Sequence, residues 1–310
     1  MSAELLSPTP DNIARAADVL RRGGLVAMPT ETVYGLAANA ANGEAVARLY
    51  AAKGRPSFNP LIAHVVSVEM AAQEGVFSDR ARDLVSTFWP GPLTLVLEAA
   101  ESGKVSTLAR AGLDSVALRM PNHPVAEALL QAFGGPVVAP SANPSGRISP
   151  TTAQHVLEDM GEKVDLILDG GPCRSGVEST IVDARQDRPA LLRPGGLDPA
   201  EIETVWPGLM RPAQNPDAPQ SPGQLLRHYA PRAALRLNAK SPQKGEAYLG
   251  FGPGTATLNL SDGEDLYEAS ANLFAMLRDL DARFDRIAVA PIPETGLGEA
   301  INDRLTRAAK

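Results

Sequence analysis

The sequence predicts an α/β protein, because short apolar runs alternate with segments of helical periodicity along most of the chain. Glycine and proline stand between these segments, where they indicate turns. The chain has 310 residues, 44% of them hydrophobic, which is enough to bury a sizeable core and suggests two domains.

The first part of the chain alternates helices and strands. Helix 10–22 places Ile13, Ala16, Ala17 and Leu20 on one face, and Pro10 suits its first turn. The other expected helices are residues 43–52, 78–88, 123–133 and 151–160. The expected strands are residues 25–28, 61–65, 93–97, 115–120, 137–139, 165–169, 176–183 and 190–196.

A proline-rich stretch, residues 206–222, lacks any periodicity and predicts a linker. Beyond it, strands are expected at residues 246–250, 255–260 and 286–290, with helices at 264–283 and 296–309. The expected domains are therefore 1–206 and 233–310, with residues 207–232 as a connection. The run GFGPG at residues 250–254 lacks the spacing of a dinucleotide-binding loop, so we expect a plain loop there.

Charge and cysteine content exclude several classes of protein. The net charge is −7, and residues 1–206 carry 17 Lys and Arg against 24 Asp and Glu, unlike a protein that mainly grips nucleic acid. The single Cys173 excludes a disulfide framework and fits a reducing compartment. Because no signal-like or membrane-spanning run is found, the expected location is cytoplasmic, with no membrane partner.

Several common catalytic motifs are missing from the sequence. It has no GxxxxGK[ST], HExxH or GxSxG, which argues against a P-loop ATPase, a zinc protease and a serine hydrolase. The four histidines are too scattered for a metal cluster, so no metal ligand is assigned to protein side chains.

The segment 136–151 (PVVAPSANPSGRISPT) is a strand followed by a loop rich in small polar residues. Ser141, Asn143, Ser149 and the nearby Arg147 offer the donors that a phosphate-rich ligand needs. The prolines restrict the loop, so it loses little entropy on binding. The alternative is a turn whose side chains satisfy their own backbone.

Other candidate residues also stand where expected strands and helices end. Residues 29–36 (PTETVYGL), with Thr32 among them, form an edge that faces a ligand, or else Thr30 or Thr32 simply caps a helical turn. Lys53 and Arg55 clamp phosphates or simply complement a helix end. His64 interrupts an apolar strand, where it is either a core histidine or a catalytic one.

Two arginines lie in or at the end of expected strands. Arg119 lies mid-strand among apolar residues, and a buried arginine needs an anion, either a structural carboxylate or a substrate carboxylate. Arg193 lies where the strand 190–196 breaks. Binding groups at strand ends are how open α/β sheets build their sites, so we expect these residues to converge.

Six blocks occur in one order, namely PTETVYGL, KGRPSFNP, WPGPL, SANPSG, GVESTIV and RPG, starting at residues 29, 53, 89, 141, 176 and 193. Together they resemble the YrdC family of threonylcarbamoyl-AMP synthases over residues 10–205. The later segment 221–231 and the tail resemble the longer, two-domain version. The resemblance implies a twisted mixed sheet around a large cavity, with a small C-terminal Rossmann-like α/β domain.

The activity implied by the resemblance is that of a nucleotidyltransferase. L-Threonine, bicarbonate or CO₂, and ATP with Mg²⁺ give threonylcarbamoyl-AMP (L-threonylcarbamoyladenylate) and pyrophosphate. The product serves tRNA threonylcarbamoyladenosine modification by downstream transfer proteins, and weak contact with tRNA is also implied.

The resemblance also assigns residues. It places Thr32, His64, Arg119, Ala139 and Ser179 in the threonine pocket. It places Lys53, Arg55, Asn59, Ser115, Ser141, Asn143, Ser149, Arg193 and Tyr229 at the ATP, with Tyr229 delivered by a linker that closes as a lid. Lys53, Arg55, His64 and Arg119 are the expected catalytic residues, although His64 could orient threonine rather than take a proton.

Three other interpretations remain at this point. A double-stranded RNA or tRNA binder is disfavoured by the acidic charge of residues 1–206. A carbamoyl-transfer protein of hydrogenase maturation needs zinc-finger cysteines, and one cysteine is too few. A regulatory relative would have kept the fold without turnover.

Overall fold

The structure is a computed structural model that describes residues 3–213, 221 and 228–310. Half of the expected connection, residues 207–232, therefore lies outside the described residues. The helices are α1 (Pro10–Arg21), α2 (Gly43–Lys53), α3 (Val68–Glu74), α4 (Asp79–Phe88), α5 (Pro124–Phe133), α6 (Ala153–Met160), α7 (Pro199–Val205), α8 (Leu266–Arg283) and α9 (Leu297–Ala308).

The strands are β1 (Glu4–Leu6), β2 (Val26–Met28), β3 (Gly35–Asn39), β4 (Ile62–His64), β5 (Gly75–Val76), β6 (Leu93–Ala99), β7 (Ser115–Arg119), β8 (Val137–Val138), β9 (Leu166–Leu168), β10 (Thr180–Asp183), β11 (Ala190–Arg193), β12 (Ala234–Arg236), β13 (Ala247–Gly250), β14 (Leu258–Asn259) and β15 (Arg286–Val289). In the part of the chain that the structure describes, they form two sheets.

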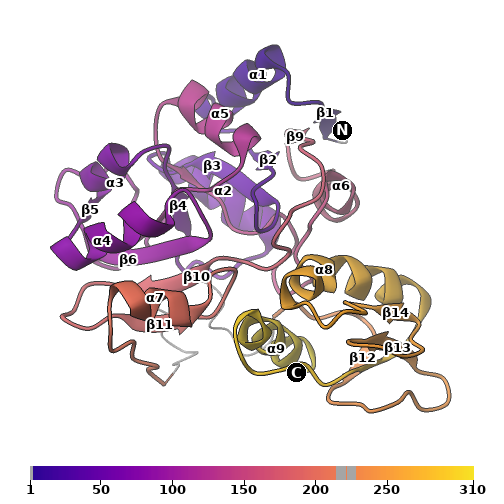
Figure 1. Ribbon diagram of the computed structural model, residues 1–310. Helices are drawn as coiled ribbons and strands as arrows, with labels where there is room; N and C mark the ends of the chain where they lie inside the picture. Colours follow the sequence, from indigo (N-terminus) through magenta and orange to yellow (C-terminus); the bar gives the residue numbers. More distant parts are fainter. Residues whose placement is uncertain (1–2, 214–220, 222–227) are drawn as a thin grey trace.

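The first sheet is mixed, as the resemblance implied. Its order is β1-β9-β2-β3-β8-β4-β7-β6-β10-β11, with β5 beside β6. Neighbours β4 and β7 are parallel, as are β6 and β10, whereas β6 and β7 are antiparallel. The second sheet, β12-β15-β13-β14, is parallel throughout, and α8 and α9 lie beside it in Figure 1.

The helices begin and end where local chemistry predicts. Thr9 caps α1 and Pro10 opens it, while α2 ends at Gly54, which has a φ of 62° in the left-handed region. Elements that the sequence did not predict are short (β1, β5, α3, α7 and β12) or rich in small residues (β3, GLAAN). Weak local propensity is overridden in β3 because β2 and β8 pair with it on both sides.

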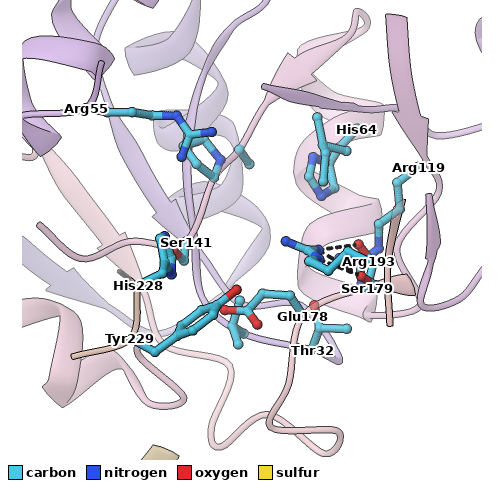
Figure 2. Close-up of a pocket in the computed structure, with 14 residues that line it drawn as sticks. Thr32, Arg55, His64, Arg119, Ser141, Glu178, Ser179, Arg193, His228 and Tyr229 are labelled. Carbon is cyan, nitrogen blue, oxygen red and sulfur yellow. Dashed lines mark hydrogen bonds between the residues drawn. The ribbon is translucent and has the colours of Figure 1, made fainter. Parts of the chain in front are cut away.

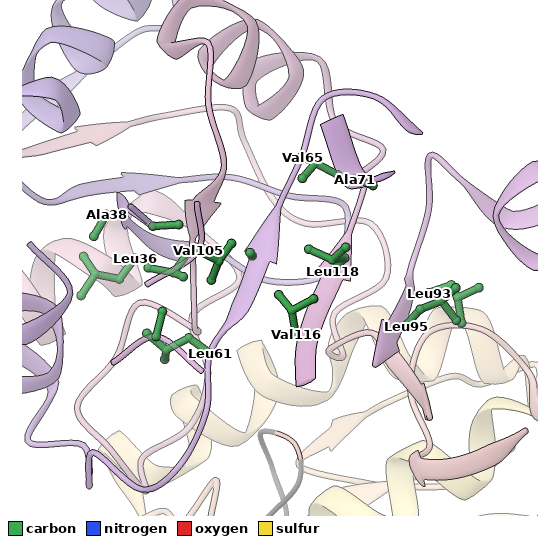
Figure 3. Close-up of a cluster of buried hydrophobic side chains, with 14 of the residues drawn as sticks. Leu36, Ala38, Leu61, Val65, Ala71, Leu93, Leu95, Val105, Val116 and Leu118 are labelled. Atoms are coloured by element: carbon green, nitrogen blue, oxygen red, sulfur yellow. The ribbon is translucent and has the colours of Figure 1, made fainter. Parts of the chain in front are cut away.

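Buried side chains cover both faces of the first sheet. Helices α1 and α5 pack on one face through residues such as Leu20 and Leu129. On the other face a larger cluster joins the strands to α2, α4 and α6, and Figure 3 shows Leu36, Leu95 and Leu118 within it. This larger cluster includes Ala63 of β4 and Leu118 of β7, so it supports the strands that carry His64 and Arg119.

The core of the second domain includes residues from the first. Val33, Ile148 and Val177 lie in loops of the first domain, yet they pack in the same cluster as Phe274 of α8. Gly176 has a φ of 71°, and a Cβ there would overlap the backbone of α8 at Ser270 and Ala271. The two domains therefore meet through a close, largely apolar contact beside the loops after β2 and β8.

Candidate functional site

A pocket of about 500 Å³, measured with the space in front of it, opens where several strands and loops end (Figure 2). Its walls come from loops, from β4, β7 and β11, and from the end of the linker. The lining residues are Thr32, Val33, Arg55, Ile62, His64, Arg119, Ala139, Pro140, Ser141, Glu178, Ser179, Arg193, His228 and Tyr229.

Parallel strands β4 and β7 place His64 beside Arg119, because the two residues are register partners. Arg119 Nη2 lies 2.6 Å from Glu31 Oε1, and both side chains are almost fully buried. Its Nε donates to the Gly91 carbonyl at 3.3 Å. Of the two anions considered for Arg119, the structure therefore supplies the structural carboxylate, Glu31, which sequence reasoning did not single out.

His64 is neutral at physiological pH. Burial, and then the positive charge of Arg119, lower its pKa to about 3. Its Nδ1 is buried and has no hydrogen-bond partner among the described residues. A base with so low a pKa removes protons poorly at neutral pH, so this environment suits orientation of a ligand better than proton transfer.

The hydroxyl groups of Thr32 and Ser179 belong to the same pocket as His64 and Arg119. Thr32 Oγ1 is 2.8 Å from Thr30 Oγ1, which also accepts from the Val33 amide at 3.3 Å. No helix starts at Thr30 or Thr32 within the described residues, so neither threonine is a helix cap. Ser179 Oγ is 2.8 Å from Thr94 Oγ1. Both hydroxyls are thus held in place from behind.

The other end of the pocket contains cations. Arg55 donates to the carbonyls of Asn59 at 3.2 Å and Pro60 at 2.9 Å, and burial first of all lowers its pKa to about 10. Arg193 donates to the Ser179 carbonyl at 2.8 Å and to its Oγ at 3.2 Å, the dashed lines of Figure 2. Both guanidinium groups remain charged at neutral pH and line the pocket.

Lys53 lies behind this wall. Its Nζ donates to the carbonyls of Ser141 and Asn143, so it ties the end of α2 to the polar loop after β8. Burial lowers the pKa of Lys53 well below its usual range, and the neighbouring Arg55 adds to the effect. The structure therefore shows Lys53 fixing the loop, in a position from which it does not line the pocket.

Glu178 is the carboxylate in the pocket wall. Its Oε1 accepts from Ser149 Oγ at 2.5 Å and its Oε2 accepts from Arg304 Nε at 2.8 Å. Burial alone would raise its pKa, but Arg304 and then Arg193 outweigh burial and lower the pKa to about 2. The adjacent RPG turn packs tightly here, because a Cβ at Gly195 would overlap the backbone of residues 178–180.

The end of the linker enters the pocket. Tyr229 is 1% exposed, and its ring stacks on Phe274 with centroids 5.5 Å apart. Its φ of 63° is unusual for a side chain of this size and indicates that packing enforces the conformation. Burial raises its pKa to about 12, so its hydroxyl can donate a hydrogen bond at neutral pH.

The structure brings together most of the residues that the sequence suggested. Those that line the pocket are Thr32, Arg55, His64, Arg119, Ala139, Ser141, Ser179, Arg193 and Tyr229. Lys53, Asn59, Asn143 and Ser149 lie directly behind them, each bonded to another site residue. Ser115 is separate, because it begins β7 and Arg119 ends it.

Unsatisfied polar atoms gather at this pocket. Both amide atoms of the Asn59 side chain, His64 Nδ1, Asn143 Oδ1, His228 Nδ1 and the Tyr229 hydroxyl are buried without a hydrogen-bond partner among the described residues. Buried polar groups are rarely left unpaired, so such a concentration indicates a binding place for a polar ligand.

Four residues of or behind the pocket were not assigned from the sequence. They are Glu31, Glu178, His228 and Arg304. The first three are adjacent to assigned residues within recognised blocks, and that adjacency was the available signal. For Arg304 no local signal exists, because it lies 126 positions from its partner Glu178.

The described residues contain neither a metal-binding cluster nor a membrane-spanning helix. No group of three or more His, Cys, Asp or Glu side chains in the described ranges could hold a metal ion. No helix among the same residues is long and apolar enough to cross a membrane.

Two family models together match most of the chain. The Sua5/YciO/YrdC model, described as "Telomere recombination", matches residues 18–195. The model described as "Threonylcarbamoyl-AMP synthase, C-terminal domain" matches residues 197–310. The second match confirms the resemblance to the longer version, with its own C-terminal domain.

Individual relatives match over nearly their whole length. The threonylcarbamoyl-AMP synthase of Bacillus subtilis is 40% identical, over 98% of this chain and 94% of that protein. The Pyrococcus abyssi protein of the same name is 43% identical, over 95% and 93%. The crystal structure of P. abyssi Sua5 complexed with L-threonine matches at 40% identity and a TM-score of 0.89, covering 99% and 97%. The chain therefore belongs to the threonylcarbamoyl-AMP synthase family.

Proposed function

We propose that this protein makes threonylcarbamoyl-AMP and pyrophosphate from L-threonine, bicarbonate or CO₂, and ATP. The observation that carries the proposal is the pocket itself. It combines buried guanidinium groups at Arg55, Arg119 and Arg193 with buried polar atoms that lack partners among the described residues. Such a lining suits a ligand that is both highly charged and rich in hydrogen-bonding groups.

The end around Arg119 suits an amino acid. The guanidinium would bind the carboxylate of threonine, with Glu31 holding it in position from behind. Thr32 and Ser179 present hydroxyls, and the neutral His64 offers an unpartnered Nδ1 among the described residues. L-Threonine in the related P. abyssi crystal structure supports this assignment.

The end around Arg55 and Arg193 suits ATP. These two cations would bind phosphate oxygens, and Ser141 lies on the loop that Lys53 holds. Mg²⁺ would arrive on the phosphates of ATP, since the described residues contain no acidic cluster to hold it alone. Its contribution would be to neutralise charge on the phosphates.

The reaction needs little covalent participation by the protein. The threonine nitrogen forms a bond to the carbon of CO₂ and loses a proton, giving a carbamate. A carbamate oxygen then attacks the α-phosphorus, and the bond to pyrophosphate breaks. Arg55 and Arg193 would stabilise the charge that develops on the phosphates, and closure of the pocket would hold three reactants together.

The wider setting follows from the product. Threonylcarbamoyl-AMP is an activated acyl group, so we propose that partner proteins transfer it to tRNA and that this chain contacts tRNA only weakly. We also propose a cytoplasmic location, since a chain with a single cysteine, the buried Cys173, contains no disulfide framework and suits a reducing compartment. The alternative of an RNA binder without turnover gains no support from the relatives, which are named synthases.

The direct test follows pyrophosphate and the adenylate by mass, with ATP, Mg²⁺ and bicarbonate, in the presence and absence of L-threonine. We expect threonine-dependent pyrophosphate together with the mass of threonylcarbamoyl-AMP. Thr32→Val should raise the KM for threonine and leave that for ATP unchanged, whereas Thr87→Val on the exposed face of α4 should change neither. ATP binding without any threonine-dependent product would contradict the proposal.

A further inference from the structure

The last helix of the chain inserts one side chain into the wall of the pocket. Arg304 of α9 is fully buried, and its Nε donates to Glu178 Oε2 at 2.8 Å. Its Nη1 donates to the Pro194 carbonyl at 2.9 Å. Because Pro194 follows Arg193, Arg304 connects the loop that carries Glu178 with the end of β11, which carries Arg193 into the pocket.

Arg304 also holds the end of the linker. Its Cζ lies 5.3 Å from the centroid of the Tyr229 ring, which stacks on Phe274 of α8 as well. A guanidinium over an aromatic face is attractive, and more so when both groups are buried. Tyr229 is therefore fixed by α8 and α9, both of them in the second domain.

The charge of Arg304 matters to an anionic ligand. Glu178 lines the pocket close to where Arg193 is expected to bind phosphate, and its carboxylate would repel phosphate oxygens if it were unpaired. Arg304 supplies the opposite charge, helped by the hydrogen bond from Ser149 Oγ. Asp303, 2.7 Å from Arg304 Nη1, keeps the guanidinium in place but lies outside the pocket lining.

We propose that Arg304 is a positioning residue of the nucleotide site, which acts through Glu178 and Tyr229 to keep the phosphate-binding end of the pocket electropositive and ordered. The C-terminal domain is then part of the catalytic unit and not a separate attachment. This inference rests on the proposed function, because it takes ATP as the anionic ligand.

A double-mutant cycle tests the inference on the full chain. Arg304→Gln should raise both the Kd and the KM for ATP by about tenfold or more, since Glu178 loses its main counter-charge in a buried site and then competes with phosphate for Arg193. The KM for threonine should change much less. Adding Glu178→Gln to Arg304→Gln should restore most of the ATP affinity, because the unpaired carboxylate is gone.

Matched variants separate this effect from damage to the fold. Arg283→Ala removes an exposed cation of α8 that pairs with Asp279, and it should leave ATP binding unchanged. If Arg304→Gln does not fold, the Kd for ATP is compared between Glu178→Gln and the double variant. Neither of these two proteins has an unpaired carboxylate at position 178. In the Glu178→Gln background, Arg304→Gln should change the Kd for ATP by less than about threefold.

The Kd values for ATP decide whether Arg304 is a positioning residue. It is overturned if Arg304→Gln binds ATP like the wild type, or if the double variant binds no better than Arg304→Gln. Wild-type protein that binds ATP without threonine-dependent pyrophosphate release would refute the proposed function, and the Kd values would still decide on Arg304. Wild-type protein that does not bind ATP would overturn both.

Discussion

Two buried arginine–carboxylate pairs flank the pocket, and they are built differently. Arg119 and Glu31, 2.6 Å apart, both belong to the first domain, with Arg119 fixed by its register beside β4. Arg304 and Glu178, 2.8 Å apart, belong to different domains. The end of the pocket proposed to bind threonine therefore has its ion pair within the first domain, whereas the ion pair at the end proposed to bind nucleotide exists only when the two domains dock.

The largest effect is expected at the first pair. Arg119→Ala should reduce threonine-dependent pyrophosphate release about 100- to 1000-fold, because a charged donor to the substrate is lost. It should also lower the free energy of unfolding by about 3–5 kcal/mol, because Glu31 is left buried without its partner. Steady-state kinetics and chemical denaturation measure the two effects. If neither Arg119→Lys nor Arg119→Ala changes the KM for threonine, Arg119 does not bind threonine.

The next effect concerns the aromatic contact between linker and second domain. Tyr229→Ala should lower the free energy of unfolding by about 3–5 kcal/mol, since a large ring between Phe274 and Arg304 is removed. Tyr229→Phe keeps the ring and should be close to neutral for stability, while raising the KM for ATP if the hydroxyl binds nucleotide. Equal melting temperatures for the two variants would show that the stacking is unimportant.

Domain docking can be weakened without touching the pocket. Gly176→Ala should destabilise the protein by about 2 kcal/mol more than Gly112→Ala, because both glycines have a positive φ but only Gly176 approaches α8. The control variant, Gly112→Ala, has the same strain from a positive φ, but no atom lies within 4 Å of the added Cβ. Thermal unfolding of the two variants measures the difference. The KM for ATP should rise in Gly176→Ala alone, and a rise in both variants would contradict the docking argument.

The smallest effects, below about 1 kcal/mol for each histidine at pH 6, come from a comparison of the two ends of the pocket by pH. His64 and His228 have pKa values of about 3, lowered mainly by burial, so the unfolded chain binds protons near pH 6.5 that the folded chain does not. Stability should be full above about pH 6.5 and fall as the pH drops below it, by up to about 1.4 kcal/mol per pH unit for each histidine. His64→Gln and His228→Gln should each remove one contribution in denaturation curves at pH 5 to 7.

The two histidines also report on the linker. If the linker end stays docked, both variants should reduce the slope equally. If it is released from the pocket in solution, His228 would titrate near its ordinary pKa, and only His64→Gln would change the slope.

Much of the first domain follows from the sequence because its signals are local. The alternation of apolar runs with helical periodicity predicted the strands β2, β4, β6 and β7 and the helices α2 and α4 within one or two residues. Short elements such as β5 and α3 carry too few residues to show a period. Because open α/β sheets build their binding sites where strands end, the polar residues at these positions were expected to converge, and most of them do.

The sequence by itself shows which positions carry charged or small side chains. Its six ordered blocks also indicate the family. Tertiary structure decided which charges meet. The partner of Arg119, the carbonyls bound by Lys53 and the reach of Arg304 across to Glu178 all join residues far apart in the chain. Local propensity reflects only neighbouring residues, whereas an ion pair 126 positions apart exists only once two cores have packed against each other.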